Sequence, residues 1–339
     1  METQAMNKNN EPLLVIENLK VAFPGQSAPV IDGLSLTLDR GEVLALVGES
    51  GSGKSMTALS LMRLLPAGAA ITGGRIRFDG EDVLSLADRQ MNRLRGGRMA
   101  MLFQQPQAML DPTSRVGAQI AEPMRLHRGL GYRAAMSRVL DLLRDVGIPD
   151  PAVRARCFSH ELSGGMAQRV MMAAALSGDP DMLIADEPTT ALDVTVQAQI
   201  LRLIDEERRK RNLATLLITH DLAVVAALAD RVAVMYAGRI VEEGPAKAVL
   251  ESPQHPYTQA LMRCSLLVPD PRGQLLSIPG SGTHARELTC GCRFHPRCSA
   301  ASQHGLTGRC MRSEPALKPD PDGHVTRCWA VEAEKETAA

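Results

Sequence analysis

The chain has 339 residues, of which 45% are hydrophobic, and its 38 Lys and Arg residues balance 38 Asp and Glu residues. This length suffices for one large domain or two, and the apolar content excludes disorder over most of the chain. A formal net charge of zero argues against a nucleic-acid-binding protein, which normally carries a basic excess or a basic stripe.

The sequence holds no apolar run that approaches the roughly 18 residues required for a membrane span. Residues 1–12 are polar and lack the apolar core of a signal peptide, so we expect a disordered N-terminal tail there. These features favour a cytosolic chain, in which the seven cysteines stay reduced and form no disulfides.

The first predicted elements are β-strands at residues 13–23 and 34–38. Residues 42–47 form a short apolar run of the kind found in buried parallel strands. After an intervening loop, a helix is expected over residues 56–65. The loop between this strand and this helix carries the first functional signal.

That loop matches the pattern G-x-x-x-x-G-K-[ST]. Its glycines let backbone N–H groups wrap a β-phosphate, Lys54 supplies charge to the β- and γ-phosphates, and the Ser55 hydroxyl can ligate magnesium. A glycine turn with an incidental Lys-Ser pair is the alternative, and the flanking strand and helix argue against it. The octet comprises Gly48, Glu49, Ser50, Gly51, Ser52, Gly53, Lys54 and Ser55.

Residues 73–78 predict a hairpin strand or the edge of a sheet. Residues 99–103 predict a further strand that ends at Gln104, whose side chain can ligate a metal or position water beside a nucleotide. From residue 107 to 176 the pattern becomes helical, and over residues 133–146 apolar side chains recur at spacings of three and four. We therefore expect a helical insertion in an α/β core.

The stretch from residue 162 to 193 holds a glycine-rich turn, Ser163-Gly164-Gly165, and then an apolar strand over residues 182–185. The N–H groups of such a turn, together with the positive end of the helix that follows, can bind an anion. Asp186 and Glu187 close the strand at the edge where ligands lie in open α/β sheets. The turn and the carboxylate pair together indicate phosphate chemistry.

The remaining core elements are a helix over residues 196–210, a buried strand over 215–219, and a hairpin made of 231–236 and 239–243. His220 follows the buried strand. Because the other strand ends already present phosphate-handling groups, we expect His220 to contact a γ-phosphate.

In this order and spacing, GESGSGKS, LSGGMAQRV, LIADEP, TALD and ITHD resemble the motifs of the nucleotide-binding subunit of an ATP-binding cassette (ABC) transporter. The resemblance covers roughly residues 12–330, and the five motifs together are far more specific than any one of them. It implies an α/β P-loop NTPase fold, with a RecA-like core, an antiparallel β subdomain and a helical subdomain at about 107–178 that carries the signature motif. The nucleotide-binding domain would span residues 13–250.

The resemblance also implies the roles of the site residues, with ATP and Mg²⁺ as cofactors. Asp186, Ser55 and Gln104 would hold Mg²⁺. Glu187 would polarise the attacking water, and His220 would stabilise the γ-phosphate. Gln104 would also sense that phosphate and couple the site to membrane subunits.

Further implied contacts concern the adenine and a partner subunit. ATP would lie on residues 48–56, Met56 included, with Phe23 stacked on the adenine. In this family two such domains close head to tail, so Asp193 would line the dimer interface and the signature motif would meet the partner's nucleotide. The signature residues are Leu162, Ser163, Gly164, Gly165, Met166 and Gln168.

Residues 252–261, SPQHPYTQAL, resemble the extension found on ATPase subunits of oligopeptide and dipeptide importers. The alternative is that they only begin a proline-capped helix. We expect an extension of this type over residues 251–339, small and rich in cysteine. It points to peptide uptake, with nickel and related solutes as neighbouring substrates.

Four cysteines of this extension lie in a segment with few apolar residues, which a metal could organise. Their spacing differs from the C-x2-C pairs of zinc ribbons. It resembles the tail of the same importer ATPases, some of which carry a 4Fe–4S cluster. A cluster, zinc and free thiols all stay open for these residues, Cys292, Cys298, Cys310 and Cys328.

The sequence is thus identified as that of an ATP-hydrolysing, energy-coupling subunit of an ABC importer for dipeptides or oligopeptides. Its expected partners are a second ABC ATPase subunit, two membrane permeases and an extracytoplasmic solute-binding protein, at the cytoplasmic face of a bacterial inner membrane. One alternative is the same role for nickel or another small solute. Another is a soluble ABC ATPase of translation or DNA repair, which usually carries a second cassette or a long coiled-coil insertion that this sequence lacks.

Overall fold

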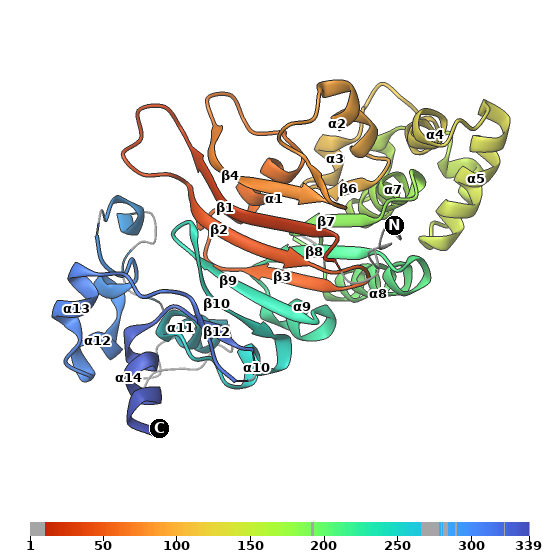
Figure 1. Cartoon of the computed structure of the whole chain (residues 1–339). Coiled ribbons are helices and arrows are strands. Elements are labelled where there is room, and N and C mark those ends of the chain that lie inside the picture. Colours follow the sequence, from red (N-terminus) through yellow and green to blue (C-terminus); the bar gives the residue numbers. More distant parts are fainter. Residues whose placement is uncertain are drawn as a thin grey trace, which may run out of the picture.

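The computed structural model describes residues 11–190, 193–265, 278, 280, 284–288, 290–321 and 323–338. The predicted tail as far as residue 10, and Ala191 and Leu192 of the TALD motif, lie outside the described residues. The described residues form two β-sheets, a group of helices at one end and a C-terminal extension at the other (Figure 1).

The smaller sheet is antiparallel and has the strand order β2-β1-β4-β5. It corresponds to the predicted antiparallel β subdomain, and its second strand begins at Ile31 rather than at Leu34. The strands are β1 (Leu14–Ala22), β2 (Ile31–Leu38), β4 (Ala70–Phe78) and β5 (Glu81–Asp82).

The larger sheet has the order β11-β12-β10-β9-β3-β8-β7-β6. From β9 to β6 its strands are parallel, as expected for continuous apolar runs that are buried on both faces. β10 and β12 run antiparallel to their neighbours. The strands are β3 (Val43–Val47), β6 (Met99–Leu102), β7 (Met182–Asp186), β8 (Ala214–Thr219), β9 (Arg231–Tyr236), β10 (Arg239–Pro245), β11 (Lys318–Pro319) and β12 (Val325–Thr326).

Two cores lie on opposite faces of the parallel strands, because successive side chains of a strand point to opposite sides. In β7, Met182 and Ile184 pack between the two sheets, whereas Leu183 and Ala185 pack against helices. The carboxyl ends of β3, β6, β7 and β8 are therefore held rigidly at one edge of the sheet, where ligands lie in open α/β folds.

The helix after the glycine-rich loop differs from its predicted bounds. We expected residues 56–65, and α1 spans Lys54–Leu61. Gly53, with φ of 112°, starts the helix, and Arg63, whose φ of 49° is left-handed, lies just beyond its end. Lys54 therefore belongs to the first turn of the helix, so its position is fixed by the helix as well as by the loop.

The predicted helical insertion is present, and its helices pack on one another and on β6. Among the regularly spaced apolar side chains of α5, Val139 and Leu143 are buried, whereas Met136 and Leu140 are half-buried. Ser163 begins α7 by accepting the Met166 N–H at 3.4 Å. The helices are α3 (Pro106–Met109), α4 (Val116–His127), α5 (Tyr132–Asp145), α6 (Pro151–Arg154) and α7 (Gly164–Ser177).

The other helices of the cassette surround the sheets and connect their strands. Asp193 starts the longest of them by accepting the N–H groups of Thr195 and Val196, so this helix begins two residues earlier than predicted. These helices are α2 (Asp88–Leu94), α8 (Val194–Arg211), α9 (Leu222–Leu228) and α10 (Ala246–Glu251).

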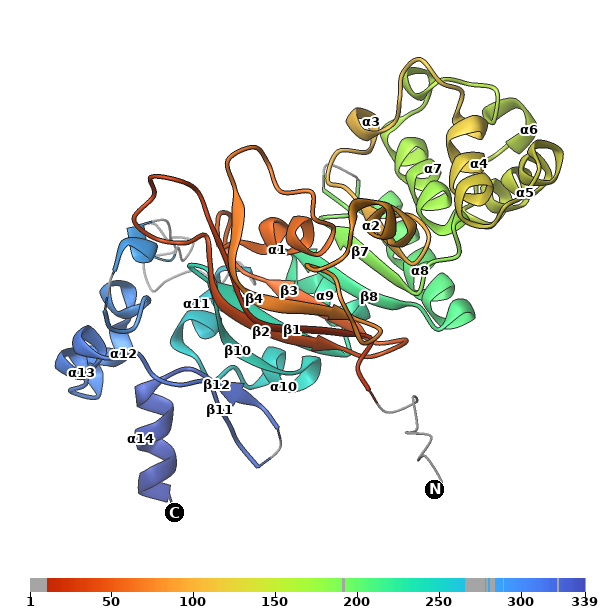
Figure 2. The same cartoon turned by 45° about the horizontal axis from the view of Figure 1, so that its top comes forward.

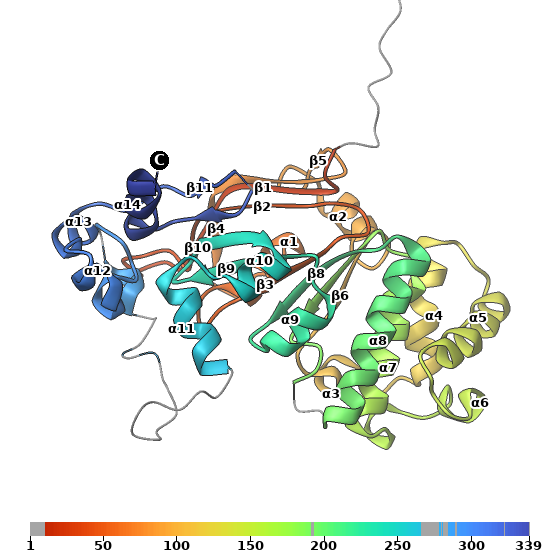
Figure 3. The same cartoon turned by 90° about the horizontal axis from the view of Figure 1, so that it is seen from below.

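The C-terminal extension docks on the end of the large sheet that is remote from the helical insertion, as Figures 2 and 3 both show. Its strand β12 pairs with β10, with Thr326 opposite Glu242, so the extension continues the sheet of the cassette. Its helices are α11 (Pro256–Ser265), η3 (His284–Glu287), η4 (His295–Arg297), α12 (Ser299–Gln303), α13 (Thr307–Arg312) and α14 (Trp329–Ala338).

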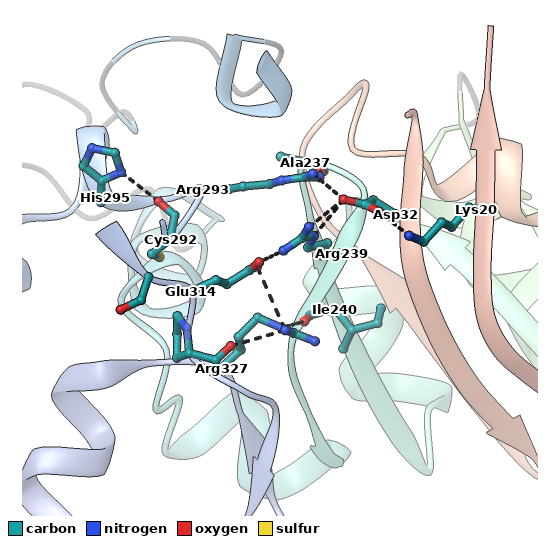
Figure 4. A network of polar contacts seen from close by, with 12 residues as sticks. Lys20, Asp32, Ala237, Arg239, Ile240, Cys292, Arg293, His295, Glu314 and Arg327 are labelled. Atoms are coloured by element: carbon teal, nitrogen blue, oxygen red, sulfur yellow. Dashed lines mark hydrogen bonds and ion pairs between the residues drawn. The ribbon is translucent and has the colours of Figure 1, made fainter. Parts of the chain in front are cut away.

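Arginine side chains join the extension to the cassette (Figure 4). Arg293 donates to the Asp32 carboxylate and to the Ala237 carbonyl, at 2.5 Å each. Arg239 of β10 pairs with Glu314 of the extension. The extension is therefore held by charge-assisted bonds as well as by strand pairing. Among the helices that the structure describes, none is both long and apolar enough to cross a membrane.

Candidate nucleotide site

The glycine-rich loop follows β3 and lies tightly against the backbone of β9. Gly48 has φ of 154°, and a Cβ atom there would lie 2.1 Å from the Met235 carbonyl oxygen. At Gly53 a Cβ atom would come within 2.7 Å of the Met235 side chain. Both positions therefore require glycine for backbone conformation and for space.

Lys54 is buried, with 6% of its surface exposed. Its Nζ donates to the carbonyl oxygens of Gly48, at 2.7 Å, and Glu49, at 3.0 Å. Burial lowers the pKa of Lys54, an effect that the nearby carboxylates of Glu187 and Asp186 oppose. A phosphate that enters the loop would offer this cation much stronger acceptors than the two carbonyls.

Ser55 and Asp186 meet at the predicted magnesium position. The Ser55 hydroxyl donates to Asp186 Oδ1 at 3.2 Å, and Asp186 is 7% exposed. Burial raises the pKa of Asp186, while the Ser55 hydrogen bond lowers it. A hydroxyl and a carboxylate are oxygen ligands of the kind that Mg²⁺ takes, so this pair fits the ion.

Glu187 is the centre of a hydrogen-bond cluster. Its Oε2 accepts the Gln104 amide at 3.0 Å and the Thr190 hydroxyl at 2.8 Å, and its Oε1 lies 3.0 Å from His220 Nδ1. Burial alone would raise the pKa of Glu187, but the bonds from Thr190 and His220 outweigh it, and the pKa is lowered. Glu187 is therefore ionised at neutral pH, as a base must be.

Of these residues, Lys54, Ser55, Gln104 and Glu187 line one pocket of about 400 Å³. Phe23 lies in its wall, which suits the predicted stacking on adenine. The Gln104 amide donates to Glu187 Oε2 at 3.0 Å, and its role as a magnesium ligand stays a prediction. The lining consists of Phe23, Gln26, Val30, Ser50, Gly51, Gly53, Lys54, Ser55, Met56, Gln104, Glu187 and Arg286.

Three features of the site were not predicted. The Thr190 hydroxyl donates to Glu187; Thr190 follows Glu187 by three residues in the sequence, and this short separation could have suggested the contact. Arg286 of the extension lines the pocket, and its buried Nε has no hydrogen-bond partner among the described residues. Glu49, predicted to bind ATP, does not line the pocket, because its carboxylate binds Arg297 of the extension. Arg286 and Arg297 lie far from the motifs in the sequence, and no pattern around them indicates that they reach the nucleotide site.

The signature turn lies in a separate pocket of about 460 Å³, which shares no lining residue with the first. Asp193 lines it too, which brings the predicted dimer-interface residue next to the turn. Leu162 and Gln168 are buried, and the Gln168 amide donates to the Pro188 carbonyl at 2.7 Å. These two side chains therefore support the turn from inside the chain. The accessible part of the turn, which lines the pocket, consists of Ser163, Gly164, Gly165 and Met166.

The four cysteines lie in the interior of the extension. Cys310 and Cys328 are buried, and Cys292 and Cys298 are half-buried against an apolar cluster. Burial raises the pKa of all four thiols, that of Cys292 to about 12, and neighbouring cysteines add to this rise for Cys292. Among the described residues, no three His, Cys, Asp or Glu side chains are arranged to hold a metal ion.

Comparison with known proteins agrees with this geometry. The chain matches the ABC transporter family over residues 31–190 and the family "Oligopeptide/dipeptide transporter, C-terminal region" over residues 241–304. The dipeptide transport ATP-binding protein DppD of Escherichia coli (strain K12) is 44% identical over 318 residues, which cover 93% of this chain and 96% of that protein.

Two solved structures show the same fold. One is a dimeric, post-hydrolysis state of the ATP-binding cassette MJ0796 bound to ADP and Pi, with a TM-score of 0.62 and 24% identity over 69% of this chain and 98% of that one. The other is cbiO1 of Clostridium perfringens, part of the ABC transporter complex cbiONQ, with a TM-score of 0.62 and 26% identity over 72% and 92%. The chain therefore belongs to the ATP-binding proteins of the oligopeptide/dipeptide transporter family and is an ABC transporter ATPase.

Proposed function

We propose that this chain couples ATP hydrolysis to the import of dipeptides or oligopeptides. It would drive two membrane permeases, supplied by an extracytoplasmic solute-binding protein, from the cytoplasmic face of a bacterial inner membrane. The observation that carries the ATPase assignment is the placement of ionised Glu187 in one pocket with Lys54 and Ser55. We assign residues 13–250 to the cassette, 107–178 to its helical subdomain and 251–339 to the extension.

The residues in and beside the pocket have different roles in hydrolysis. When bound, Mg²⁺ neutralises charge between the β- and γ-phosphates of ATP. Ser55 and Asp186 are placed to hold it, and Lys54 to hold the phosphates. Glu187 accepts a hydrogen bond from a water molecule and orients it, while His220 stabilises the γ-phosphate. The transition state of phosphoryl transfer to water is stabilised by positioning of the reactants and by nearby charges, and it needs no covalent bond to the protein.

A second ATPase subunit, identical or related, completes this site. The signature turn and the glycine-rich loop of one chain open into different pockets, so the turn has no nucleotide of its own chain to bind. Head-to-tail pairing would bring the turn of each chain to the phosphates of the other, with Asp193 at the interface. Hydrolysis would then depend on closure of the dimer.

Peptide transport is favoured over nickel because both the extension and the whole chain match peptide-transporter proteins. The test is growth of a deletion strain with a dipeptide as its only source of a required amino acid. We expect growth to be lost, to return with the wild-type gene, and not to return with Glu187→Gln. Normal growth on dipeptides together with failure of nickel-dependent growth would support the nickel importer instead.

We further propose that the four cysteines hold a 4Fe–4S cluster. Burial raises the pKa values of these four thiols, so their deprotonation is unfavourable in the folded chain. Binding of iron or another cation would compensate the negative charge of the thiolates and make deprotonation favourable. Zinc is the alternative occupant of the same four cysteines, although their spacing differs from the C-x2-C pairs of zinc ribbons. Protein purified without oxygen should contain iron and acid-labile sulfide, which Cys310→Ser should lose. Zinc, or no metal at all, would contradict the proposal.

A further inference from the structure

Glu49, the second residue of the glycine-rich loop, is held through all three of its polar groups. Its N–H donates to the Tyr257 hydroxyl at 2.8 Å. Its carbonyl accepts Lys54 Nζ at 3.0 Å and the Ser52 N–H at 3.1 Å. Its carboxylate accepts both terminal nitrogens of Arg297, at 2.8 and 2.9 Å. The backbone of Glu49 is thus fixed on both sides of its Cα atom.

Two of these partners, Tyr257 and Arg297, belong to the extension. Tyr257 is fully buried in the first turn of α11, and its ring centroid lies 4.6 Å from that of Tyr236. Arg297 ends η4; its side chain is 7% exposed and also donates to the Tyr236 hydroxyl at 3.2 Å. The pKa of Arg297 is raised, chiefly by its bond to Glu49, so the guanidinium stays charged. Both side chains are therefore held in place by burial and by contacts with Tyr236.

We propose that the extension is a working part of the nucleotide site, in which Arg297 and Tyr257 position the glycine-rich loop for the phosphates of ATP. A loop with this many glycines has wide conformational freedom, and ordering it on each binding event costs entropy. Because Glu49 is already fixed before ATP binds, less entropy is lost when the loop closes on the phosphates. The same residue also provides the carbonyl that accepts Lys54 Nζ, so the position of Lys54 is fixed with it. Arg297 acts through the loop and is a positioning residue.

The pocket itself gives a second reason to connect the extension with nucleotide. Arg286, which lies in η3, lines the pocket beside the glycine-rich loop. Two separate segments of the extension therefore reach the site, one behind the loop and one into the pocket. Loss of docking by the extension would disturb both.

The test measures binding of a fluorescent ATP analogue, with Mg²⁺, to the full-length chain. Arg297→Gln removes the two hydrogen bonds from the guanidinium to the Glu49 carboxylate. ATP binding should weaken by about tenfold, which corresponds to the net free energy of one charge-assisted hydrogen bond. Glu49→Gln should weaken it similarly, and the double variant should be no weaker than either, because the residues act as one pair. Arg297→Lys should recover part of the loss, since lysine keeps the charge without the bidentate geometry.

Arg327→Gln is the matched control. Arg327 also joins the extension to the cassette, by donating to the Ile240 carbonyl at 3.0 Å (Figure 4). Its described side-chain partners, Ile240, Pro315 and Glu314, lie outside the glycine-rich loop. It should leave ATP affinity within about twofold of wild type. Tyr257→Phe serves if Arg297→Gln does not fold, because it deletes only the hydroxyl that accepts from Glu49.

In the assembled transporter, Arg297→Gln should raise KM for ATP and leave kcat nearly unchanged. Equal loss of affinity in Arg297→Gln and Arg327→Gln, or wild-type affinity in Arg297→Gln and Tyr257→Phe, would overturn the proposal. The proposal rests on nucleotide binding by this loop and not on the transported solute. A negative result in the dipeptide growth test would therefore leave it intact.

Discussion

Thr190 donates its hydroxyl hydrogen to Glu187 Oε2 at 2.8 Å, on the same oxygen that accepts the Gln104 amide. His220 contacts the other oxygen, at 3.0 Å. The three partners come from the ends or following loops of β6, β7 and β8, so three strands together orient one carboxylate. An oriented and ionised carboxylate is what activation of a water molecule requires.

Glu187→Gln tests the base directly. The amide keeps the size of the side chain but cannot take up a proton, so ATP should still bind while turnover falls by on the order of a hundredfold or more. The measurements are phosphate release by the assembled transporter and nucleotide binding by the chain. With ATP present, the variant should also accumulate as a closed dimer on size-exclusion chromatography. Wild-type turnover would remove Glu187 from this role.

Thr190→Val removes one of the hydrogen bonds that lower the pKa of Glu187. The pKa of the carboxyl should therefore rise, and the acid limb of the pH–rate profile should move to higher pH. Activity should fall most at low pH and recover as the pH is raised. Thr190→Ser keeps the hydroxyl and should keep the wild-type profile. An unshifted acid limb in the valine variant would show that Thr190 does not tune the base.

Gly164→Ala tests the function of the signature turn without disturbing the fold of the chain. A Cβ atom at Gly164 meets none of the described residues of its own chain within 4 Å, so the midpoint of thermal unfolding and ATP binding by the isolated chain should be unchanged. ATP hydrolysis by the assembled transporter should fall at least tenfold if the partner's nucleotide packs on this turn. Wild-type hydrolysis would argue against the head-to-tail arrangement.

Gly165→Ala is the useful contrast to that variant. Its Cβ atom would lie 2.8 Å from Val196 Cγ1 of the same chain. Some loss of thermal stability is therefore expected in addition to any loss of hydrolysis. If Gly164→Ala destabilised the chain as much as Gly165→Ala, its effect on hydrolysis could not be assigned to the partner.

His255 predicts a pH dependence of stability. It is buried, accepts the Tyr257 N–H at Nδ1, and has its pKa lowered by burial from 6.5 to about 4. The folded state keeps it neutral while the unfolded state takes up a proton below pH 6.5. The free energy of unfolding should therefore decrease as the pH falls from 6.5 to 4, by roughly 3 kcal/mol at most.

Urea unfolding at pH 7 and at pH 5 measures this loss. His255→Asn is the reference, because its amide oxygen can accept the same N–H but does not titrate. The wild-type protein should lose more stability between the two pH values than the variant does. Equal losses would show that His255 does not contribute.

The sequence predicted the site wherever a motif fixes it locally. The glycine-rich loop and the polar residues at the ends of β6, β7 and β8 lie where parallel strands must deliver them, at one edge of the sheet. Hydrophobic periodicity located the strands well because strand burial is strictly patterned. Helix ends were less well placed, since α1 depends on the backbone of Gly53 and Arg63 rather than on apolar spacing.

The contribution of the extension could not be predicted. Arg286 and Arg297 stand in a segment with little apolar periodicity, and their partners lie in the first part of the chain. Nothing in the local pattern says where such a segment docks, because docking depends on strand pairing and buried charge between distant elements. Only the folded chain brings Arg297 to Glu49.

The Glu49–Arg297 pair joins residues that are 248 positions apart in the sequence. A ribosome therefore completes the glycine-rich loop, its strand and most of the cassette long before it synthesises the arginine that supports the loop. Contacts of such long range form late, because closing a long chain segment is entropically unfavourable. A nascent or prematurely terminated chain that lacks Arg297 would hence have a less firmly positioned glycine-rich loop and would bind ATP more weakly.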